Sequence, residues 1–162
     1  MTAGADLAAD FARNTWIVRE QVAGLDHADS LLQTPYRINC LNWTLGHLLD
    51  NRGAVLDLLG EKRALPAAET ARYRAESDPI REDGPEVLPL ERLAAALEES
   101  QERIAAALAA LDAEALAAES DRGDGTPASL WSQLHFLYFH DTYHTGQTEL
   151  LRQVTGVGDK II

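Results

Sequence analysis

The segment over residues 126–155 constrains the fold most, because it predicts one long helix whose inward face is not fully apolar. Thr126 followed by Pro127 is a typical helix start, since a threonine side chain can accept from the first turn and proline suits the first helical position. Gly156 is a typical helix stop. Residues at steps of three and four form one stripe, which we expect to face the interior: Leu130, Leu134, Leu137, Asp141, His144, Thr148 and Leu151.

Polar side chains occupy the middle of this stripe, where a core helix normally carries leucine. His140 and His144 are four residues apart, so both imidazoles project from the same helix face about one turn from each other. Burying two histidines and an aspartate costs free energy unless a partner satisfies them. A bound metal ion would satisfy the imidazoles.

A third histidine lies on a second predicted helix. This helix begins at Asn39 or Asn42, either of which can cap it, and ends near Leu59. His47 lies beside its apolar face, within LNWTLGHLLDNRG. The preceding Gly46 costs about 1 kcal/mol relative to alanine in a helix interior. We expect either a neighbouring backbone or ligand at this glycine, or a plain packing contact.

The rest of the chain completes an all-α pattern. Residues 3–24 and 88–111 show helical periodicity, and residues 112–125 combine a short acidic helical piece with a Gly/Asp turn. Residues 61–88 form a long polar connection of the kind used for crossovers, lids or binding loops. No segment predicts a strand. We therefore predict a four-helix bundle in a single domain over residues 1–162, with a long crossover that lets its second and third helices run parallel.

The composition excludes several kinds of binding partner and cellular location. The net charge of −12 and the presence of only two lysines, Lys62 and Lys160, disfavour nucleic-acid binding. A single cysteine, Cys40, excludes an intrachain disulfide, fits a reducing compartment and is expected to be a small buried residue. No apolar run is long enough for a membrane span or a signal peptide, so we expect a soluble, cytoplasmic protein that does not bind membranes.

His47, His140 and His144 are the candidate metal ligands. His135 lies about 140° around the helix from His140, and His27 lies in a connection, so neither is expected to join them. Three imidazoles from two helices suit zinc, nickel or iron, and three protein ligands leave positions open for water or a substrate. The residues alone also allow a second interpretation, in which the histidines are hydrogen-bonded core residues without a metal.

The two histidine segments together resemble a known family. LNWTLGHLLDNRG, followed about ninety residues later by HDTYHTGQ, is similar to the motif pair of the DinB/YfiT-like superfamily, and the resemblance extends over the whole chain. It implies a four-helix bundle of uncommon topology, a three-histidine site for a divalent ion, and a homodimer. The ion would be zinc or nickel first, with iron or manganese as alternatives. By position the ligands are His47, His140 and His144, while Asp141 and Gln147 would support them or pack the helices.

The resemblance also implies an activity. Members with assigned activities are mostly transferases and isomerases that use mycothiol, bacillithiol or glutathione. The implied mechanism is attack of a metal-bound low-molecular-weight thiolate on an electrophilic small molecule, since a metal lowers the pKa of a thiol. Arg37, Arg52 or an arginine of residues 61–88 would bind carboxylates of the thiol, whereas the acidic connections would repel them.

Two other functions compete with this one. HDTYH is similar to the H-E-x-x-H of zinc proteases, but Asp141 is shorter than glutamate and no histidine follows His144 as a third ligand. The other alternative is a non-catalytic bundle in which a metal joins two helices and which serves as a stress-linked binding module. Closed structural zinc sites normally have four protein ligands, whereas three are expected here.

The spacing of the aromatic residues along the helices predicts which of them lie near the histidines. Trp43 lies four residues before His47 and is expected either to line the pocket or to fill core volume. Trp16 and Trp131 are expected to fill the core. Tyr143 should point about 100° away from the histidine that follows it, so we expect no catalytic role for it.

Overall fold

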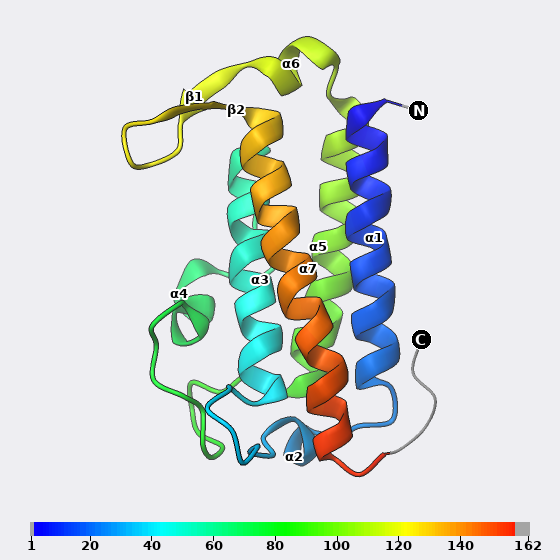
Figure 1. Cartoon of the computed structure of the whole chain (residues 1–162), viewed down its shortest axis with the longest axis vertical. Coiled ribbons are helices and arrows are strands. Elements are labelled where there is room, and N and C mark those ends of the chain that lie inside the picture. The colour runs from blue at the N-terminus through cyan, green and yellow to red at the C-terminus, as the bar shows by residue number, and fades with distance from the viewer. Residues whose placement is uncertain (1, 158–162) are drawn as a thin grey trace.

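Four long helices form the bundle that the sequence predicts. The computed structural model describes residues 2–157, so residue 1 and residues 158–162 of the predicted domain lie outside the described residues. The long helices are α1 (Ala3–Val22), α3 (Leu41–Leu58), α5 (Leu90–Ala110) and α7 (Leu130–Val154) (Figure 1). The connections hold α2 (His27–Ser30), α4 (Ala67–Thr70), the 3-10 turn η1 (Ala71–Tyr73) and α6 (Ala113–Ala117).

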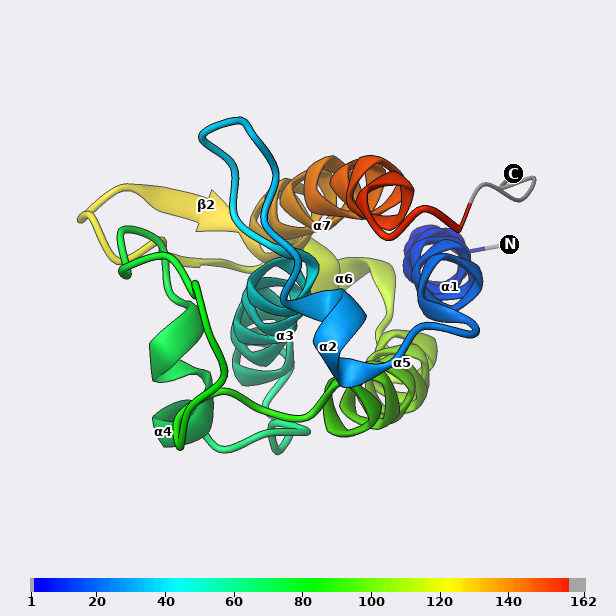
Figure 2. The ribbon, with the colours of Figure 1, turned by 90° about the horizontal axis from the view of Figure 1, so that it is seen from below.

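The four long helices do not simply alternate in direction along the chain. In Figure 1, α1 and α7 run downward while α3 and α5 run upward. Figure 2 shows the four helices at the corners of the bundle, where α1 packs on α5 and α7, and α3 packs on the same two helices. The adjacent helices α3 and α5 are therefore parallel, as predicted. Parallel neighbours need a long return connection, which residues 59–89 supply.

Helical stripes account for the packing of α1 and α5. Thr2 caps α1, since its hydroxyl accepts from the backbone N–H of Ala5 at 3.3 Å. Gly4 lets α1 approach α5, because a Cβ there would lie 2.6 Å from the carbonyl oxygen of Leu108. The buried apolar residues of the two helices follow steps of three, four or seven, as an amphipathic helix requires: Leu7, Phe11 and Val18 on α1, and Leu90, Leu93, Leu97, Ile104 and Leu108 on α5.

Helix α3 is buried on nearly all sides, because residues 59–89 cover its outer face. The ring of Tyr73 lies directly against Gly46, where a Cβ would come within 2.1 Å of Cδ1 of Tyr73. A packing contact therefore explains the mid-helix glycine. The predicted caps are wrong: Cys40 is the N-cap and makes no side-chain cap bond. Asn42 is used instead to donate to the carbonyl of Leu88 at 2.9 Å, which ties the helix to the long connection.

The start of α7 also differs from the prediction. Residues Pro127–Ser129 form strand β2, which pairs antiparallel with β1 (Glu119–Asp121), and Ser129 caps the helix that begins at Leu130. The expectations of a helix from Thr126 and of no strand are both wrong.

Turn chemistry explains this hairpin. The carboxylate of Asp121 accepts from the backbone N–H groups of Gly123 and Gly125, each at 2.8 Å. Both glycines have positive φ angles of 96° and 82°, a conformation that favours glycine. Asp124 accepts from the N–H of Thr126 at 2.9 Å. These bonds fold residues 121–126 back, so Pro127 enters a strand before it can start a helix.

Several smaller expectations can be compared with the structure. Cys40 is buried and unpaired, as expected. Trp131 packs partly buried against the core, but Trp16 is 43% exposed, so the expectation that it fills the core is wrong. None of the helices in the described part of the chain has the length and apolar character that crossing a membrane requires.

Candidate metal centre

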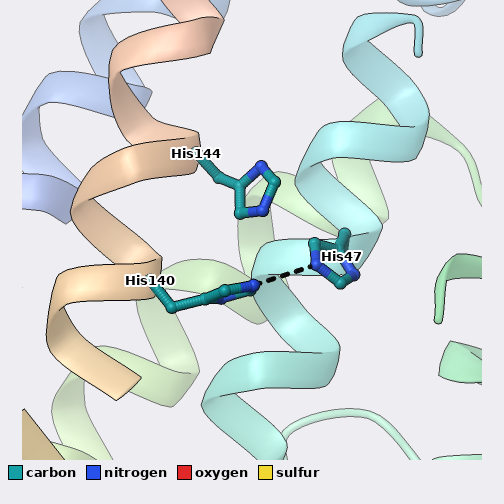
Figure 3. A group of neighbouring side chains, drawn as sticks. All are labelled: His47, His140 and His144. Atoms are coloured by element: carbon teal, nitrogen blue, oxygen red, sulfur yellow. Dashed lines mark hydrogen bonds between the residues drawn. The ribbon is translucent and has the colours of Figure 1, made fainter. Parts of the chain in front are cut away.

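The structure brings the three predicted ligands together in the seam between α3 and α7. Figure 3 shows His47 of α3 facing His140 and His144 of α7, with the rings turned toward one another. One ligating atom from each histidine lies within 4.8 Å of the other two. The Nε2 atoms of His47 and His140 are 3.2 Å apart. Within residues 2–157 this is the one cluster of histidine, cysteine or acidic side chains close enough to hold a metal ion.

The other two histidines lie elsewhere, as expected. His135 is exposed, and its ring contacts Trp131 and Tyr138 on its own helix. His27 is partly buried, with its Nδ1 accepting from the backbone N–H of Leu90 at 3.3 Å. Its role is therefore to satisfy the first turn of α5, which has no side-chain cap of its own.

His47 is held in one orientation by the long connection. Its Nδ1 lies 2.8 Å from the carbonyl oxygen of Tyr73. A carbonyl can only accept, so Nδ1 carries the proton and the lone pair of Nε2 faces the cluster. Trp43 stacks on the imidazole with ring centroids 4.7 Å apart, and its Nε1 donates to Oγ of Ser77 at 2.9 Å. Sequence reasoning missed Tyr73, although Gly46 was the local signal of its contact.

His144 is oriented in the same way from its own helix. Its Nδ1 lies 2.8 Å from Oε1 of Gln147, one turn further along α7. With the amide oxygen in this position, Nδ1 donates and the lone pair of Nε2 is free. Gln147 therefore contacts the cluster directly and fixes the tautomer of one ring.

Asp141 belongs to a different environment, although it follows His140 in the sequence. Its carboxylate accepts from Nε and Nη2 of Arg52 at 2.8 and 3.2 Å and from Nδ2 of Asn14 at 3.0 Å. The side chains of Arg52 and Asp141 are both fully buried. The hypothesis that Arg52 binds a carboxylate of a thiol is therefore wrong. A protease-like role is also disfavoured, because Asp141 is not free to activate a water molecule.

The electrostatics of the site favour neutral imidazoles. Burial lowers the pKa of His140, and the nearby His47 lowers this pKa further. Burial also lowers the pKa of His144 to about 4, against a smaller rise from its hydrogen bond to Gln147. Both side chains are therefore neutral at pH 7, which is the state in which histidine binds metals.

The residues present fit a divalent metal ion. Two nitrogens bound to one zinc ion at about 2.0–2.1 Å and at the tetrahedral angle are about 3.3–3.4 Å apart. The 3.2 Å between Nε2 of His47 and Nε2 of His140 is close to this separation. Among the described residues, Nδ1 of His140 is buried without a hydrogen-bond partner. An ion held by the three Nε2 atoms would leave this Nδ1 as it is, so the fit rests on the spacing of the Nε2 atoms.

A pocket of about 310 Å³, which we call the His144 pocket, adjoins the cluster between residues 37–39 and α7. Arg37 and Trp43 line it from one side, and His144 and Gln147 line it from the other. Tyr143 also lines it, with its ring perpendicular to that of His144 at 5.1 Å. Tyr143 was expected to point away from His144, but its ring contacts that histidine and borders the same pocket.

The comparisons with known proteins agree with this architecture. The family model described as the DinB superfamily matches residues 18–148. The chain belongs to the DinB superfamily. A similar solved structure is the crystal structure of a conserved protein from Enterococcus faecalis, at a TM-score of 0.74 and 16% identity, covering 96% of this chain and 98% of that chain. At this identity the likeness shows a shared fold alone. A search of curated proteins gives no match.

Proposed function

We propose that this DinB-superfamily protein binds one divalent metal ion through His47, His140 and His144 and acts as a transferase. In the proposed reaction, a low-molecular-weight thiol loses its proton to solvent and its sulfur forms a bond to an electrophilic carbon of a small molecule, while the leaving group on that carbon departs with its bonding electron pair. One observation carries the metal proposal. The bonds from Nδ1 of His47 and Nδ1 of His144 to acceptor oxygens direct the Nε2 lone pairs of both rings toward the cluster. This arrangement is typical of metal-binding histidines, whose second nitrogen is held by a hydrogen bond.

The donor set supports zinc or nickel as the ion. Imidazole suits zinc, copper, iron and nickel, whereas magnesium, calcium and manganese prefer oxygen ligands, so manganese is the weakest of the four candidates. When bound, such an ion would lower the pKa of a coordinated thiol and make the thiolate available at neutral pH.

Residues around the cluster would orient the metal ligands and the thiol. The carbonyl of Tyr73 and the amide of Gln147 hold two ligands in fixed tautomers, and Trp43 fixes the plane of His47. Arg37 borders the His144 pocket and has no hydrogen bond or ion pair among residues 2–157. It can therefore bind a carboxylate of a small thiol and orient the thiol's sulfur toward the histidines.

The His144 pocket favours a catalytic metal site over a metal ion that only joins two helices. A metal that merely joins α3 to α7 would need no adjoining cavity, whereas the His144 pocket of about 310 Å³ has the size of a small-molecule site. A non-catalytic, metal-joined bundle with a role in stress binding remains the alternative. It predicts metal content without turnover.

Metal content of the untagged, dialysed protein by elemental mass spectrometry tests the proposal. We expect about one zinc or nickel ion per chain, and loss of the ion in His144→Ala. His135→Ala is the matched control, because this histidine is on the same helix but outside the cluster. The loaded protein would then be assayed for consumption of glutathione, bacillithiol and mycothiol with a chlorodinitrobenzene electrophile. Absence of metal, with no uptake of added zinc or nickel, would contradict the proposal.

We also propose a cytoplasmic homodimer. The outward face of α7 supports an interface, because Phe139, Tyr143 and Leu150 are between 59% and 64% exposed. Exposed apolar patches of this kind mark interaction surfaces. Sedimentation of the protein should give a dimer, and Phe139→Glu should give a monomer. The control is Glu149→Lys, which changes an exposed charge on the same helix. A monomeric wild-type protein would refute the dimer and leave the metal proposal intact.

A further inference from the structure

A second and larger pocket lies on the same α3–α7 seam, toward the hairpin end of the bundle. Its volume is about 500 Å³, within the usual range for small-molecule sites. It is formed by α3, by α7 and by the β1–β2 hairpin, and we call it the hairpin pocket. Its lining residues are Ala54, Asp57, Leu58, Arg122, Ser132, Gln133, Phe136 and Leu137.

The floor of the hairpin pocket is apolar. Leu58 and Leu137 are partly buried and pack against the hydrophobic core beneath them. Phe136 stands beside them with 57% of its surface exposed, which is unusual for a large aromatic residue. The floor and this ring together offer a surface for the apolar body of a ligand.

The free charge at this pocket is positive, although the chain carries a net charge of −12. Asp57 is already paired, since its two carboxylate oxygens accept from Nε of Arg63 at 3.1 and 3.0 Å. The side chain of Arg122 makes no hydrogen bond and no ion pair within residues 2–157. The pKa of Asp124 is lowered mainly by hydrogen bonds from Thr126, and the nearby charge of Arg122 lowers this pKa further. An anion is therefore the complementary ligand group.

The hairpin holds Arg122 in place over the pocket. The backbone N–H of Arg122 donates to the carbonyl of Thr126 at 3.1 Å. Nε2 of Gln133 donates to Oγ of Ser120 at 2.9 Å and to the carbonyl of Ala128 at 3.0 Å, which attaches both strands to α7. A cation carried on an anchored backbone loses less freedom when a ligand binds.

The hairpin pocket and the His144 pocket flank the histidine cluster. Leu137 precedes His140 by three residues, or about 4.5 Å along the helix. Asn51 of α3 is 8% exposed, and its Nδ2 donates to the carbonyl of Leu137 at 3.1 Å. The His144 pocket begins on the other side, at His144 itself. Ligands in the two pockets would therefore approach the cluster from opposite ends of the seam.

We propose that the hairpin pocket binds a small amphipathic carboxylate. Its apolar or aromatic body would pack on Phe136, Leu58 and Leu137, and its carboxylate would pair with Arg122. In one further step, which rests on the proposed function, this ligand is the electrophilic substrate, and the thiol occupies the His144 pocket. Binding at the hairpin pocket itself requires no metal.

A titration of ¹⁵N-labelled protein by two-dimensional NMR tests this site. The probe is 4-phenylbutyrate, and its neutral match is 4-phenylbutyramide. We expect amide shifts concentrated at residues 54–58, 120–126 and 132–137. An exposed ion pair contributes up to about 1 kcal/mol, so the carboxylate should bind about two- to fivefold more tightly than the amide. Arg122→Gln should abolish this preference, whereas Arg37→Gln, in the other pocket, should retain it.

Several outcomes would overturn the inference. These are the absence of shifts up to the solubility limit of the probe, shifts confined to the His144 pocket, or an unchanged preference in Arg122→Gln. Phe136→Ala gives an independent check, because this exposed position should tolerate alanine while probe binding weakens. Repeating the titration on metal-free His144→Ala separates the two proposals. Binding there would support the pocket even if the metal proposal failed, and metal uptake without probe binding would leave only the proposed function.

Discussion

Two clusters of polar side chains lie on different faces of α7. Protein groups make all the hydrogen bonds of the first cluster but not those of the second. Asp141 faces the core, where Arg52 gives it two hydrogen bonds and Asn14 gives it a third. The remaining donors of Arg52 reach Oγ1 of Thr15 at 2.8 Å and Oγ of Ser100 at 3.3 Å, so protein groups complete this cluster.

The histidine cluster includes His140, which immediately precedes Asp141, and protein groups leave this cluster incomplete. Its rings are held by Tyr73 and Gln147 on the outside, while their inner nitrogens face one another. Among the described residues, Nε2 of His47 and Nε2 of His140 have only each other as partners, and Nε2 of His144 has none. Buried polar groups are normally hydrogen-bonded, so a closed cluster indicates a structural role and an incomplete one indicates a missing ligand. Both clusters join α3 to α7, but only the histidine cluster has nitrogen atoms available to bind a further ligand.

The largest expected effect comes from breaking the closed cluster. Arg52→Leu would leave the carboxylate of Asp141 buried and uncompensated, so we expect the free energy of unfolding to fall by about 3–5 kcal/mol. Urea unfolding followed by circular dichroism measures this change. Arg81→Leu, at an exposed arginine, should change the stability by less than about 0.5 kcal/mol. A loss in Arg52→Leu as small as the control's would mean that the pair does not support the fold.

The double variant Arg52→Met/Asp141→Leu sharpens this test. It removes both charges together, and replacing a buried ion pair by apolar residues is often neutral. It should therefore be more stable than Arg52→Leu alone. A double variant that is less stable than the single one would show that the hydrogen bonds around the pair, and not the lone charge, dominate.

The next effect concerns the incomplete cluster. A metal that binds the folded state alone, at about 100 times its dissociation constant, raises the free energy of unfolding by about 2.7 kcal/mol. Zinc or nickel should have this effect on the wild-type protein and on Arg81→Leu but not on His144→Leu. Differential scanning calorimetry with and without metal gives the comparison. Equal stabilisation of all three proteins would place the metal elsewhere.

A smaller loss of stability is expected from a substitution at Gly46, where residues 59–89 pack against α3 beside the histidine cluster. Gly46→Ala would place a Cβ 2.1 Å from Cδ1 of Tyr73, so the ring and the carbonyl that holds His47 must both move. Overpacking of this kind costs about 1–3 kcal/mol. Metal affinity should fall at the same time.

Gly146→Ala is the matched control for this substitution. No atom lies within 4 Å of a Cβ at Gly146, so alanine should stabilise α7 by up to about 1 kcal/mol. If Gly46→Ala behaved like Gly146→Ala in both stability and metal affinity, the contact with Tyr73 would be irrelevant to the site.

Long periodic segments made most of the fold and the histidine set predictable. His140 and His144 share a face because they are four residues apart, and this local relation needs no knowledge of the rest of the chain. His47 was found in the same way, from its place beside an apolar stripe. The hairpin was missed because its strands have three residues each and are largely exposed, so they carry no alternating pattern.

Relations between distant residues were not predictable. The pairing of Arg52 with Asp141 spans 89 positions, and nothing near Arg52 in the sequence distinguishes a buried arginine from an exposed one. The support of His47 by Tyr73 comes from a connection without periodicity, where only the choice of glycine at position 46 gave a local signal. Arg122 became a candidate residue only when the hairpin had placed it over a pocket.

The smallest expected effect is on metal affinity, and it tests whether Gln147 supports a metal ligand without binding the metal itself. Gln147→Leu removes the acceptor for Nδ1 of His144 but leaves all three imidazoles in place. Loss of such a partner weakens metal binding by about 10-fold at the lower end, so the ion should still be bound at micromolar concentration. Gln147→Glu keeps an acceptor oxygen and should restore the affinity, because a carboxylate accepts from an imidazole N–H at least as well as an amide does. Competition with a chromophoric chelator measures both constants, and Gln153→Leu, at an exposed position on the same helix, is the control. A Gln147→Leu variant with the affinity of the control would show that His144 needs no orientation from its own helix, and the tautomer argument for the site would then rest on His47 alone.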